Sequence, residues 1–309
     1  MIDLHCDTLT DMAHGGCADT LDDATKALSL SALPEGVHWA QCFAVFIPDE
    51  LRGRDAIAYY ERWRDSFDRQ TAQFRDRVLP CRGAAELERA WAEGKAAALL
   101  TVENGSVLAG SLERVARLAE DGVRAVTLTW NGENELGSGH ETDHGLTDFG
   151  RRAVSELERC GVLVDASHLN DCGFCDLLDV AQKPFLVTHS NARAVCAHPR
   201  NLTDGMIREL VRRGCLIGLN YYVRFLRDDG APCTLDDLCR HAMRFFDLGA
   251  ERCLALGSDF DGAALPDCLS SPARVLDFYD CLLAHGVTRE QADGVFWRNA
   301  QAFFERNLP

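Results

Sequence analysis

The sequence predicts an α/β protein, a (β/α)8 TIM barrel in which residues 1–309 form a single domain. Three observations favour this fold. Amphipathic helical segments alternate with short apolar strands, several of the helices end at a glycine, and side chains that can carry chemistry follow the strands. Eight such strand–helix units in about 300 residues are typical of this barrel.

The alternation of helix and strand is clearest after residue 111, where four amphipathic helices each run into a glycine and then an apolar strand. Glycine adopts the left-handed conformation that ends many helices, and a hydroxyl side chain satisfies the free N–H groups at a helix start. The predicted ends are Gly122, Gly161, Gly214 and Gly249; the predicted N-caps are Ser111, Thr203 and Thr234, with Thr288 and Gln291 as a capping box.

Eight segments read as strands, and nearly all are short, apolar and followed by a helical pattern, which predicts parallel strands covered by helices. A doubly wound open sheet is the competing architecture, but no Gly-x-Gly-x-x-Gly follows the first strand. The last helix, over 288–307, carries Phe296, Ala300, Phe303 and Phe304 on one face, so we expect it to cover the barrel. The expected strands lie near 2–5, 41–47, 97–102, 124–129, 162–166, 185–188, 215–219 and 253–257.

The charge and hydropathy of the chain exclude several classes of protein. With 32 Lys+Arg against 48 Asp+Glu, the formal net charge is −16, which excludes a nucleic-acid partner held by a basic face. No segment approaches the ~18–20 apolar residues of a membrane span, and no basic-then-apolar leader opens the sequence. We therefore expect a soluble, cytoplasmic protein with no membrane partner; a homodimer stays open.

The 14 cysteines are scattered through apolar patterns, so we expect most of them to be buried thiols rather than disulfides. The one close pair, Cys172-Gly-Phe-Cys175, lacks the second pair that a zinc motif needs and falls in a predicted helix. We expect no redox or metal function there.

Side chains that can bind metals or move protons close five of the eight predicted strands. In a (β/α)8 barrel the carboxyl ends of the strands meet in one mouth, so these side chains should converge. They are His5 and Asp7 after the first strand, Glu103 after the third, His168 after the fifth, His189 after the sixth and Asp259 after the eighth.

The residue types in this mouth suit zinc or a similar divalent ion. His5 and Asp7 are two residues apart, which places both on one face of a strand, and imidazole with carboxylate is a common zinc donor set. His168 and His189 supply a second set, and Glu103 has two oxygens with which to bridge two metals about 3.5–4 Å apart.

A carboxylated lysine bridges the metals in many hydrolase barrels, but this chain offers little for that role. Its only lysines are Lys26, Lys95 and Lys183, and the last two precede strands rather than end them. Glu103 is therefore the expected bridge. Asp259 is left to take a proton from an attacking water, whose pKa falls to about 7 on metal coordination. These roles together predict a metal-assisted hydrolase that cleaves an amide, an ester or a related bond.

The motifs that carry these residues resemble those of the renal, or membrane, dipeptidase family of zinc peptidases. The resemblance covers most of the chain, through DLHCDT, TVENG, GLTDFGRRAVSELERCGVLVDASH, PFLVTHSNARAVCAHPRN and GSDFDG. It implies two zinc ions per chain, one on His5 and Asp7, the other on His168 and His189, with Glu103 between them. It also implies hydrolysis of dipeptides, often with tolerance of a D-residue at the C-terminal position.

The resemblance also implies roles for two further residues and shows one departure. Arg200 is similar to the family arginine that binds the free carboxylate of the substrate, and Asp259 to its proton-shuttling aspartate. The family commonly has a substrate-contacting histidine after the fourth strand, where this chain has Trp130. An indole donates one hydrogen bond and carries no charge, so losing an imidazole there can cost roughly 10²–10³ in rate unless another group replaces it.

Candidates for that replacement lie in the polar loop 131–146, because loops after barrel strands carry specificity. We expect Trp130 and Asn131 to contact substrate. His140 and His144 would pair as metal ligands only in a helix, which Gly137, Gly139 and Gly145 disfavour. The polar candidates in the loop are Asn131, Glu133, Asn134, His140, Glu141, Asp143 and His144.

Two other functions remain open at this point. One is an amidohydrolase-type metal hydrolase acting on a lactam, lactone or cyclic amide, which would have no use for Arg200. The other is a metal-binding relative with impaired catalysis, which would have no use for Asp259 as a proton shuttle.

Overall fold

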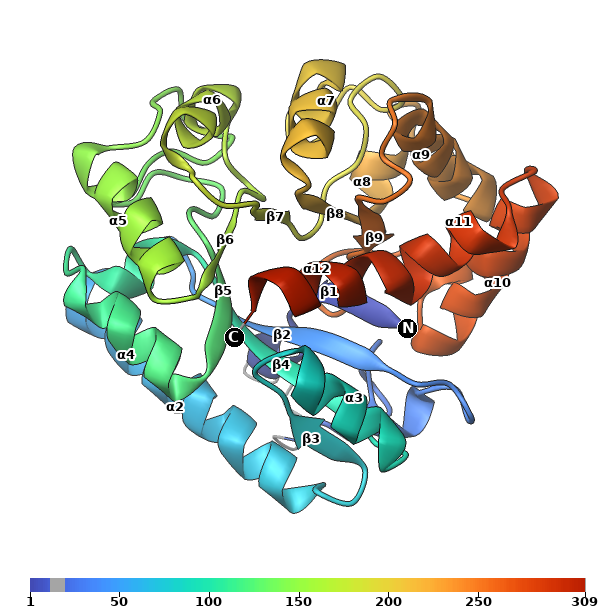
Figure 1. Cartoon of the computed structure of the whole chain (residues 1–309), viewed down its shortest axis with the longest axis horizontal. Coiled ribbons are helices and arrows are strands. Elements are labelled where there is room, and N and C mark those ends of the chain that lie inside the picture. The colour runs from blue at the N-terminus through green and yellow to red at the C-terminus, as the bar shows by residue number, and fades with distance from the viewer. Residues whose placement is uncertain (12–19, 309) are drawn as a thin grey trace.

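The computed structural model describes residues 1–11 and 20–308, and their strands close into an eight-stranded parallel barrel surrounded by helices (Figure 1). Strand β1 pairs with β2 on one side and with β9 on the other, and β2 pairs with β4, so the sheet has no open edge in this ring. The predicted (β/α)8 fold is confirmed and the open sheet is excluded. The barrel strands are β1 (Ile2–Cys6), β2 (Ala40–Phe46), β4 (Ala96–Glu103), β5 (Val123–Thr127), β6 (Leu163–Asp165), β7 (Leu186–Val187), β8 (Leu216–Leu219) and β9 (Leu254–Leu256).

A ninth strand, β3 (Val78–Pro80), was not predicted from the sequence. It pairs with the first residues of β4, Ala96 to Ala98, whereas β5 pairs with the remainder of β4, from Leu100 to Glu103. The strand is only three residues long, which is too short to show a period of two.

The helices form an outer layer around the barrel (Figure 1). The predicted caps hold at Thr203, Thr234 and Thr288, whose side chains accept hydrogen bonds at the helix starts. Ser111 is wrong as an N-cap, because α4 begins at Glu113 and Ser111 lies in the preceding turn. The layer comprises α2 (Gly53–Gln73), α3 (Ala84–Ala92), α4 (Glu113–Asp121), α5 (Asp148–Arg159), α6 (Asp171–Val180), α7 (Asp204–Arg213), α9 (Leu235–Asp247) and α10 (Pro272–Ala284), with short helices α1 (Thr8–Asp11) and α8 (Val223–Leu226).

The end of the chain closes one end of the barrel. The predicted helix 288–307 is present as α11 (Arg289–Asp293), a π-helical turn at Gly294–Arg298 and α12 (Asn299–Asn307). Ala300, Phe303 and Phe304 of α12 pack in one cluster with the inward-facing residues of the strands. Helix α12 therefore covers the amino-terminal end of the barrel, as expected (Figure 1), and leaves the carboxyl end for a site.

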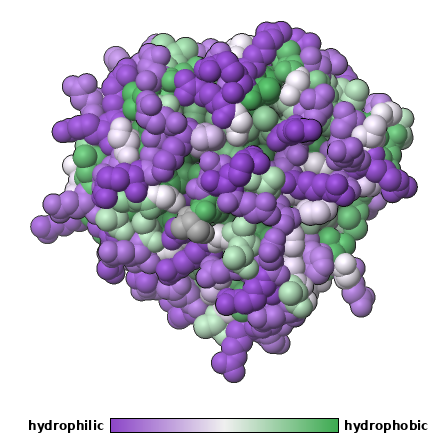
Figure 2. Space-filling view, in the orientation of Figure 1, coloured by the Kyte–Doolittle hydropathy of each residue, from purple (hydrophilic) through white to green (hydrophobic). Residues whose placement is uncertain are grey.

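The surface carries few large apolar side chains. Figure 2 shows hydrophilic residues over most of one face, and Leu276 is the single large hydrophobic residue classed as exposed in residues 1–11 and 20–308. Across the same residues, no helix is both long enough and apolar enough to cross a membrane. Cys172 and Cys175 lie on α6, the helix expected there, and both are exposed.

Candidate metal centre

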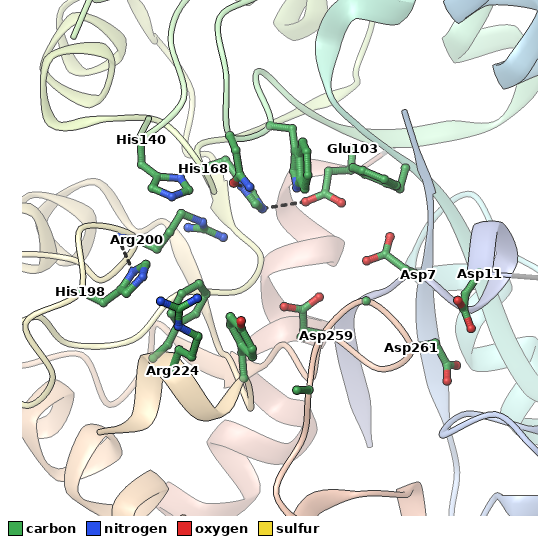
Figure 3. Close-up of a pocket in the computed structure, with 18 of the residues that line it drawn as sticks. Asp7, Asp11, Glu103, His140, His168, His198, Arg200, Arg224, Asp259 and Asp261 are labelled. Atoms are coloured by element: carbon green, nitrogen blue, oxygen red, sulfur yellow. Dashed lines mark hydrogen bonds and ion pairs between the residues drawn. The ribbon is translucent and has the colours of Figure 1, made fainter. Parts of the chain in front are cut away.

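The strand ends bring every predicted site residue to one place. A cavity of about 580 Å³ opens at the carboxyl end of the barrel, and predicted residues line it (Figure 3). His5 and His189 lie buried at its floor, in contact distance of Glu103. The predicted residues in the cavity wall are Asp7, Glu103, Trp130, Asn131, His168, Arg200 and Asp259.

A β-bulge directs His5 into this mouth. Ile2 and Leu4 belong to the cluster inside the barrel, so strict alternation would place His5 outside. The register with β2 shifts between Asp3 and Cys6, and the inserted residue re-aims the strand. His5 Nε2 consequently lies 3.5 Å from Asp7 Oδ2 and 3.7 Å from Glu103 Oε2. The two-residue period of a strand predicted that His5 and Asp7 lie together, but it did not predict the bulge that directs them into the mouth.

Glu103 is the centre of the cluster. Its Oε1 lies 2.8 Å from His168 Nε2 and 3.6 Å from His189 Nε2, while Oε2 faces His5. Asp259 Oδ1 approaches the same His5 nitrogen at 3.8 Å. Three imidazoles and three carboxylates thus converge from the ends of five strands.

The network behind the histidines directs their lone pairs toward Glu103. His168 Nδ1 lies 2.9 Å from Asn131 Oδ1, an acceptor, so this nitrogen donates and Nε2 is unprotonated. His189 Nδ1 lies 2.9 Å from Thr188 Oγ1, whose own proton goes to Asp165 Oδ2 at 2.7 Å. Both Nε2 atoms therefore carry a lone pair, as metal ligation requires.

Asp165 was not singled out in the sequence, yet it anchors the floor of the site. Besides Thr188 it accepts a 2.6 Å hydrogen bond from Thr127 Oγ1, and its Oδ1 accepts from the backbone N–H groups of Ser167 and Thr188, each at 3.0 Å. These bonds join β5, β6 and β7 directly below the two histidines. The sequence contained one indication of this role, because Asp165 is the aspartate of the VDASH motif that ends in His168.

Burial and mutual charge shift the pKa values in the cluster. Desolvation, with the positive charge of Arg200, lowers the pKa of His168 and His189 well below the usual range, so both are neutral. Burial also acts to lower the pKa of His5, but the carboxylates of Glu103 and Asp7 outweigh it and raise that pKa to about 10. Burial and the nearby Asp7 raise the pKa of Glu103.

These residues fit divalent cations. His5, Glu103 and His189 form one group of donors and His5, Asp7 and Asp259 another, with the donor atoms of each group within 4.8 Å of one another. His5 Nε2 and Asp7 Oδ1 are buried without a hydrogen-bond partner. A buried unsatisfied polar atom costs about 1–3 kcal/mol, and three carboxylates packed together repel one another. Cations in the cluster would remove both penalties.

Two site residues adopt strained backbone conformations. His168 has a φ of 72° and Asp259 a φ of 65°, both in the left-handed region. Each such residue costs about 1–3 kcal/mol, which the surrounding structure must offset. Each lies three residues after the end of its strand, β6 or β9, and the turn directs the side chain into the mouth instead of along the strand.

Two residues that the sequence did not reveal hold Asp259 in position. Asn220, just after β8, donates a 3.0 Å hydrogen bond from Nδ2 to Asp259 Oδ2. A Cβ on Gly262 would lie 1.9 Å from Asp7 Oδ2 and 2.7 Å from Asp259 Oδ1, so only glycine lets this turn pass between the two carboxylates. The final glycine of GSDFDG was the available signal.

Arg200 forms the opposite wall of the cavity. It is 4% exposed, and its guanidinium donates to Ser190 Oγ at 3.3 Å and to the carbonyl oxygen of His189 at 3.4 Å. Nε has no partner, and no carboxylate of the described residues forms an ion pair with it. Burial lowers its pKa to about 10, which leaves it cationic at neutral pH.

The cavity is therefore electrostatically divided. Figure 3 shows the basic side chains on one side and the acidic ones on the other, with the imidazole of His168 and the carboxylate of Glu103 between them. His198 and Arg224 were not predicted, because they lie on a loop and on the short helix α8, whose paths the strand pattern does not specify. The basic side has His140, His198, Arg200 and Arg224; the acidic side has Asp7, Asp11, Asp259 and Asp261.

Trp130 and the following loop complete the wall. The Trp130 indole packs edge-on against Phe46, with ring centroids 4.9 Å apart, and lies 6.4 Å from the ring of His168. The loop forms short bridges instead of a helix, as its glycines predicted. His140 lies in the cavity wall with its Nδ1 buried and unpartnered, whereas His144 is exposed outside it.

A closed parallel barrel with imidazoles and carboxylates converging at its strand ends defines a class of metal-dependent hydrolase barrels. Comparison with known proteins narrows the class. Residues 1–306 match the membrane dipeptidase family, peptidase family M19, so the chain belongs to this family of metallopeptidases.

Individual relatives agree with this assignment. The chain is similar to a metallopeptidase from Rhodobacter sphaeroides, solved with a phosphinate mimic of the dipeptide L-Ala-D-Ala, at 26% identity and a TM-score of 0.93, covering 99% of this chain and 98% of that one. It is also similar to the metallopeptidase called dipeptidase AC, at 27% identity and a TM-score of 0.94 over the same shares. An uncharacterized protein from the pqqA 5' region of Klebsiella pneumoniae is 33% identical over 234 residues, 72% of this chain and 86% of that protein.

Proposed function

We propose that this chain is a dizinc dipeptidase that hydrolyses the peptide bond of small dipeptides, including those with a C-terminal D-residue. The observation that carries the proposal is the buried Arg200, which forms no ion pair with the described residues, across the cavity from a cluster of imidazole and carboxylate donors. A dipeptide is a small zwitterion, and its carboxylate and peptide bond match these two features.

The zinc ions would be held by His5 and Asp7 on one side, His168 and His189 on the other, and Glu103 between them. Neutral imidazoles and carboxylates suit zinc, and the unpartnered His5 Nε2 and Asp7 Oδ1 supply donor atoms that need a ligand. When bound, such ions polarise a carbonyl oxygen and lower the pKa of water to about 7.

Arg200 would bind and orient the substrate. Its guanidinium presents N–H groups to the cavity, and a carboxylate can accept two of them in parallel. Burial removes competing water, so the pair is stronger than one at the surface. The relative from Rhodobacter sphaeroides was solved with a phosphinate mimic of L-Ala-D-Ala, which supports a dipeptide substrate with a C-terminal D-residue.

Asp259 would move the proton. Its Oδ2 is held by Asn220, which leaves Oδ1 as the oxygen directed at the metal-binding cluster. A carboxylate placed there can accept the proton of the attacking water and deliver it to the nitrogen of the departing amine.

His140 would supply the substrate contact that Trp130 lacks. Desolvation, together with the charge on Arg200, lowers the pKa of His140 to about 4, so the ring is neutral at pH 7 and can donate one hydrogen bond. Its position beside Arg200 and His168 faces the space that a substrate carbonyl would occupy (Figure 3). Trp130 would instead shape the pocket together with Phe46.

The proposal is tested by metal analysis joined to a dipeptide screen. Protein purified without chelator should carry about two more zinc ions than a Glu103→Ala variant, and it should cleave L-Ala-D-Ala and L,L-dipeptides. Chelation should abolish cleavage and added Zn²⁺ should restore it. Full activity in metal-free protein would refute the proposal, as would inactivity against every dipeptide with both ions bound.

A further inference from the structure

A second group of metal-binding side chains lies outside the barrel mouth, between helices α9 and α10. The donor atoms of Cys239, Cys281 and His285 all lie within 4.8 Å of one another. Asp236 joins them, because its Oδ1 lies 3.6 Å from Cys281 Sγ and 3.4 Å from His285 Nε2. None of the four lines the catalytic cavity, and the proposed dipeptidase chemistry uses none of them.

The spacing of these residues explains why they meet. Asp236 and Cys239 are three residues apart in the first turns of α9, and Cys281 and His285 are four apart at the end of α10. Side chains at these spacings lie on one face of a helix. The two helices pack against each other, so the two faces come together in the outer layer seen in Figure 1.

The second nitrogen of His285 is already engaged. Nδ1 lies 2.9 Å from the carbonyl oxygen of Cys281, to which it donates. Nε2 therefore carries the lone pair, and this is the nitrogen nearest to Asp236. Metal-binding histidines are commonly oriented by such a bond from the other ring nitrogen to a carbonyl oxygen.

We propose that Cys239, Cys281, His285 and Asp236 bind one zinc ion that ties α9 to α10. Two thiolates, an imidazole and a carboxylate complete a tetrahedral zinc site, and thiolates discriminate against magnesium and calcium. The ion enters as each thiol releases its proton to solvent.

Two of the six ligand–ligand distances already suit this geometry, and rotation of the exposed Asp236 and His285 side chains brings the other contacts of these residues into range. Zinc–ligand bonds of about 2.0–2.3 Å place tetrahedral ligand atoms about 3.3–3.8 Å apart. The two contacts of Asp236 Oδ1 fall in this range. The two sulfur atoms are 2.9 Å apart, and a rotation of the half-buried Cys281 side chain opens that edge. Cys239 is buried and His285 lies at the rim, so the site is closed on one side and reachable from the other.

A cobalt titration of the full-length, reduced protein after metal removal tests the proposal. Thiolate ligation of Co²⁺ gives a charge-transfer band in the near ultraviolet, and none of the residues proposed for the barrel centre is a thiolate. We expect the band in the wild type, in Glu103→Ala and in the exposed-pair control Cys172→Ser/Cys175→Ser. It should be lost in Cys239→Ser/Cys281→Ser, whose zinc content falls by one ion per chain while dipeptide cleavage is unchanged.

A milder variant distinguishes loss of the metal site from misfolding, which could also explain a lost band in Cys239→Ser/Cys281→Ser. His285→Asn changes a side chain at the rim and should keep the fold while weakening Co²⁺ binding by about tenfold or more. Three results would overturn the proposal: no thiolate band in the reduced wild type, a band that persists in Cys239→Ser/Cys281→Ser, or Cys239 and Cys281 joined in a disulfide with no ion bound. Because Glu103→Ala keeps this site, failure here is distinct from failure of the barrel centre.

Discussion

Asn220 donates a 3.0 Å hydrogen bond to Oδ2 of Asp259, and this single contact sets which oxygen of the carboxylate faces the metal-binding cluster. Oδ1 is left 3.8 Å from His5 Nε2. The role proposed for Asp259 therefore depends on a residue that is not among those lining the cavity.

Replacing Asn220 by alanine should lower kcat by about 10- to 100-fold, the value of a hydrogen bond to a charged group, with little change in KM. Asp259→Asn should cost more, about 10²–10⁴, because it removes the proton acceptor itself. Steady-state kinetics with metal content measured in parallel provides the check, and Asn307→Ala, distant from the mouth, is the control. An Asn220→Ala enzyme with normal kcat would contradict the positioning role.

Arg200→Ala should reduce kcat/KM for dipeptides by about 10- to 100-fold, chiefly through KM, since a charge-assisted pair contributes about 1.5–3 kcal/mol. The matched control is Arg212→Ala, because Arg212 is exposed on α7 and pairs with Glu209 at the surface. Dipeptide amides, which lack the carboxylate, should be poor substrates of the wild type and be unaffected by Arg200→Ala. An unchanged KM would favour a lactam or lactone as the substrate.

His140→Ala should lower kcat/KM by about 10- to 100-fold if its neutral imidazole donates to the substrate. His144→Ala, in the same loop but exposed, should have no effect. Because the pKa of His140 is about 4, the loss should be the same from pH 6 to pH 8. Equal activity of the two variants would exclude His140 as the replacement for the family histidine.

Gly262→Ala should disrupt the metal centre, because the added methyl would collide with Asp7 Oδ2 at 1.9 Å and with Asp259 Oδ1 at 2.7 Å. We expect loss of zinc and of most activity with the barrel still folded. Gly205→Ala is the control, since a Cβ there meets only the Thr203 side chain at 3.8 Å. Zinc content and circular dichroism separate the two outcomes, and normal zinc binding by Gly262→Ala would show that the turn can move aside.

His241 should make the fold sensitive to acid. Burial lowers its pKa from 6.5 to about 4, and it is neutral while it accepts from Ala192 N–H and donates to the Leu226 carbonyl oxygen. Between these two values the unfolded chain binds a proton that the native state does not, so the free energy of unfolding falls as pH falls. Relative to His241→Gln, the wild type should lose about 2 kcal/mol between pH 7 and pH 5.

Denaturant titrations of the two proteins at both pH values measure this difference. His144→Gln, which replaces an exposed histidine, should behave like the wild type. A wild type and a His241→Gln variant with the same pH dependence would show that His241 accepts its proton without cost.

The sequence alone was sufficient for the barrel and for most of the candidate site, because parallel strands end at one face and their last residues need no further information to be placed together. His168, His189 and Glu103 are of this kind. The bulge at His5 could not be foreseen, since a spacing of two predicts the same pair of residues with or without it. Ser111 failed as a cap because the preceding turn, not the hydroxyl, determines where α4 begins.

Residues on loops were the hardest to predict. His198 reaches the cavity, and Asn220 reaches Asp259, only through the tertiary path of their segments, and neither periodicity nor residue type marks that path. The same holds for Arg224 on the four-residue helix α8. The cluster of Cys239 and Cys281 was missed for the same reason: 42 residues separate the two cysteines, and only the packing of α9 on α10 brings them together.

The position of α12 has a consequence for biosynthesis. Ala300, Phe303 and Phe304 cover the amino-terminal end of the barrel. The ring itself closes only when the first strand, β1, pairs with the last, β9. During translation the apolar residues at that end of the barrel therefore stay exposed until residues 300–304 have left the ribosome. A chain truncated just before them would expose this apolar surface permanently.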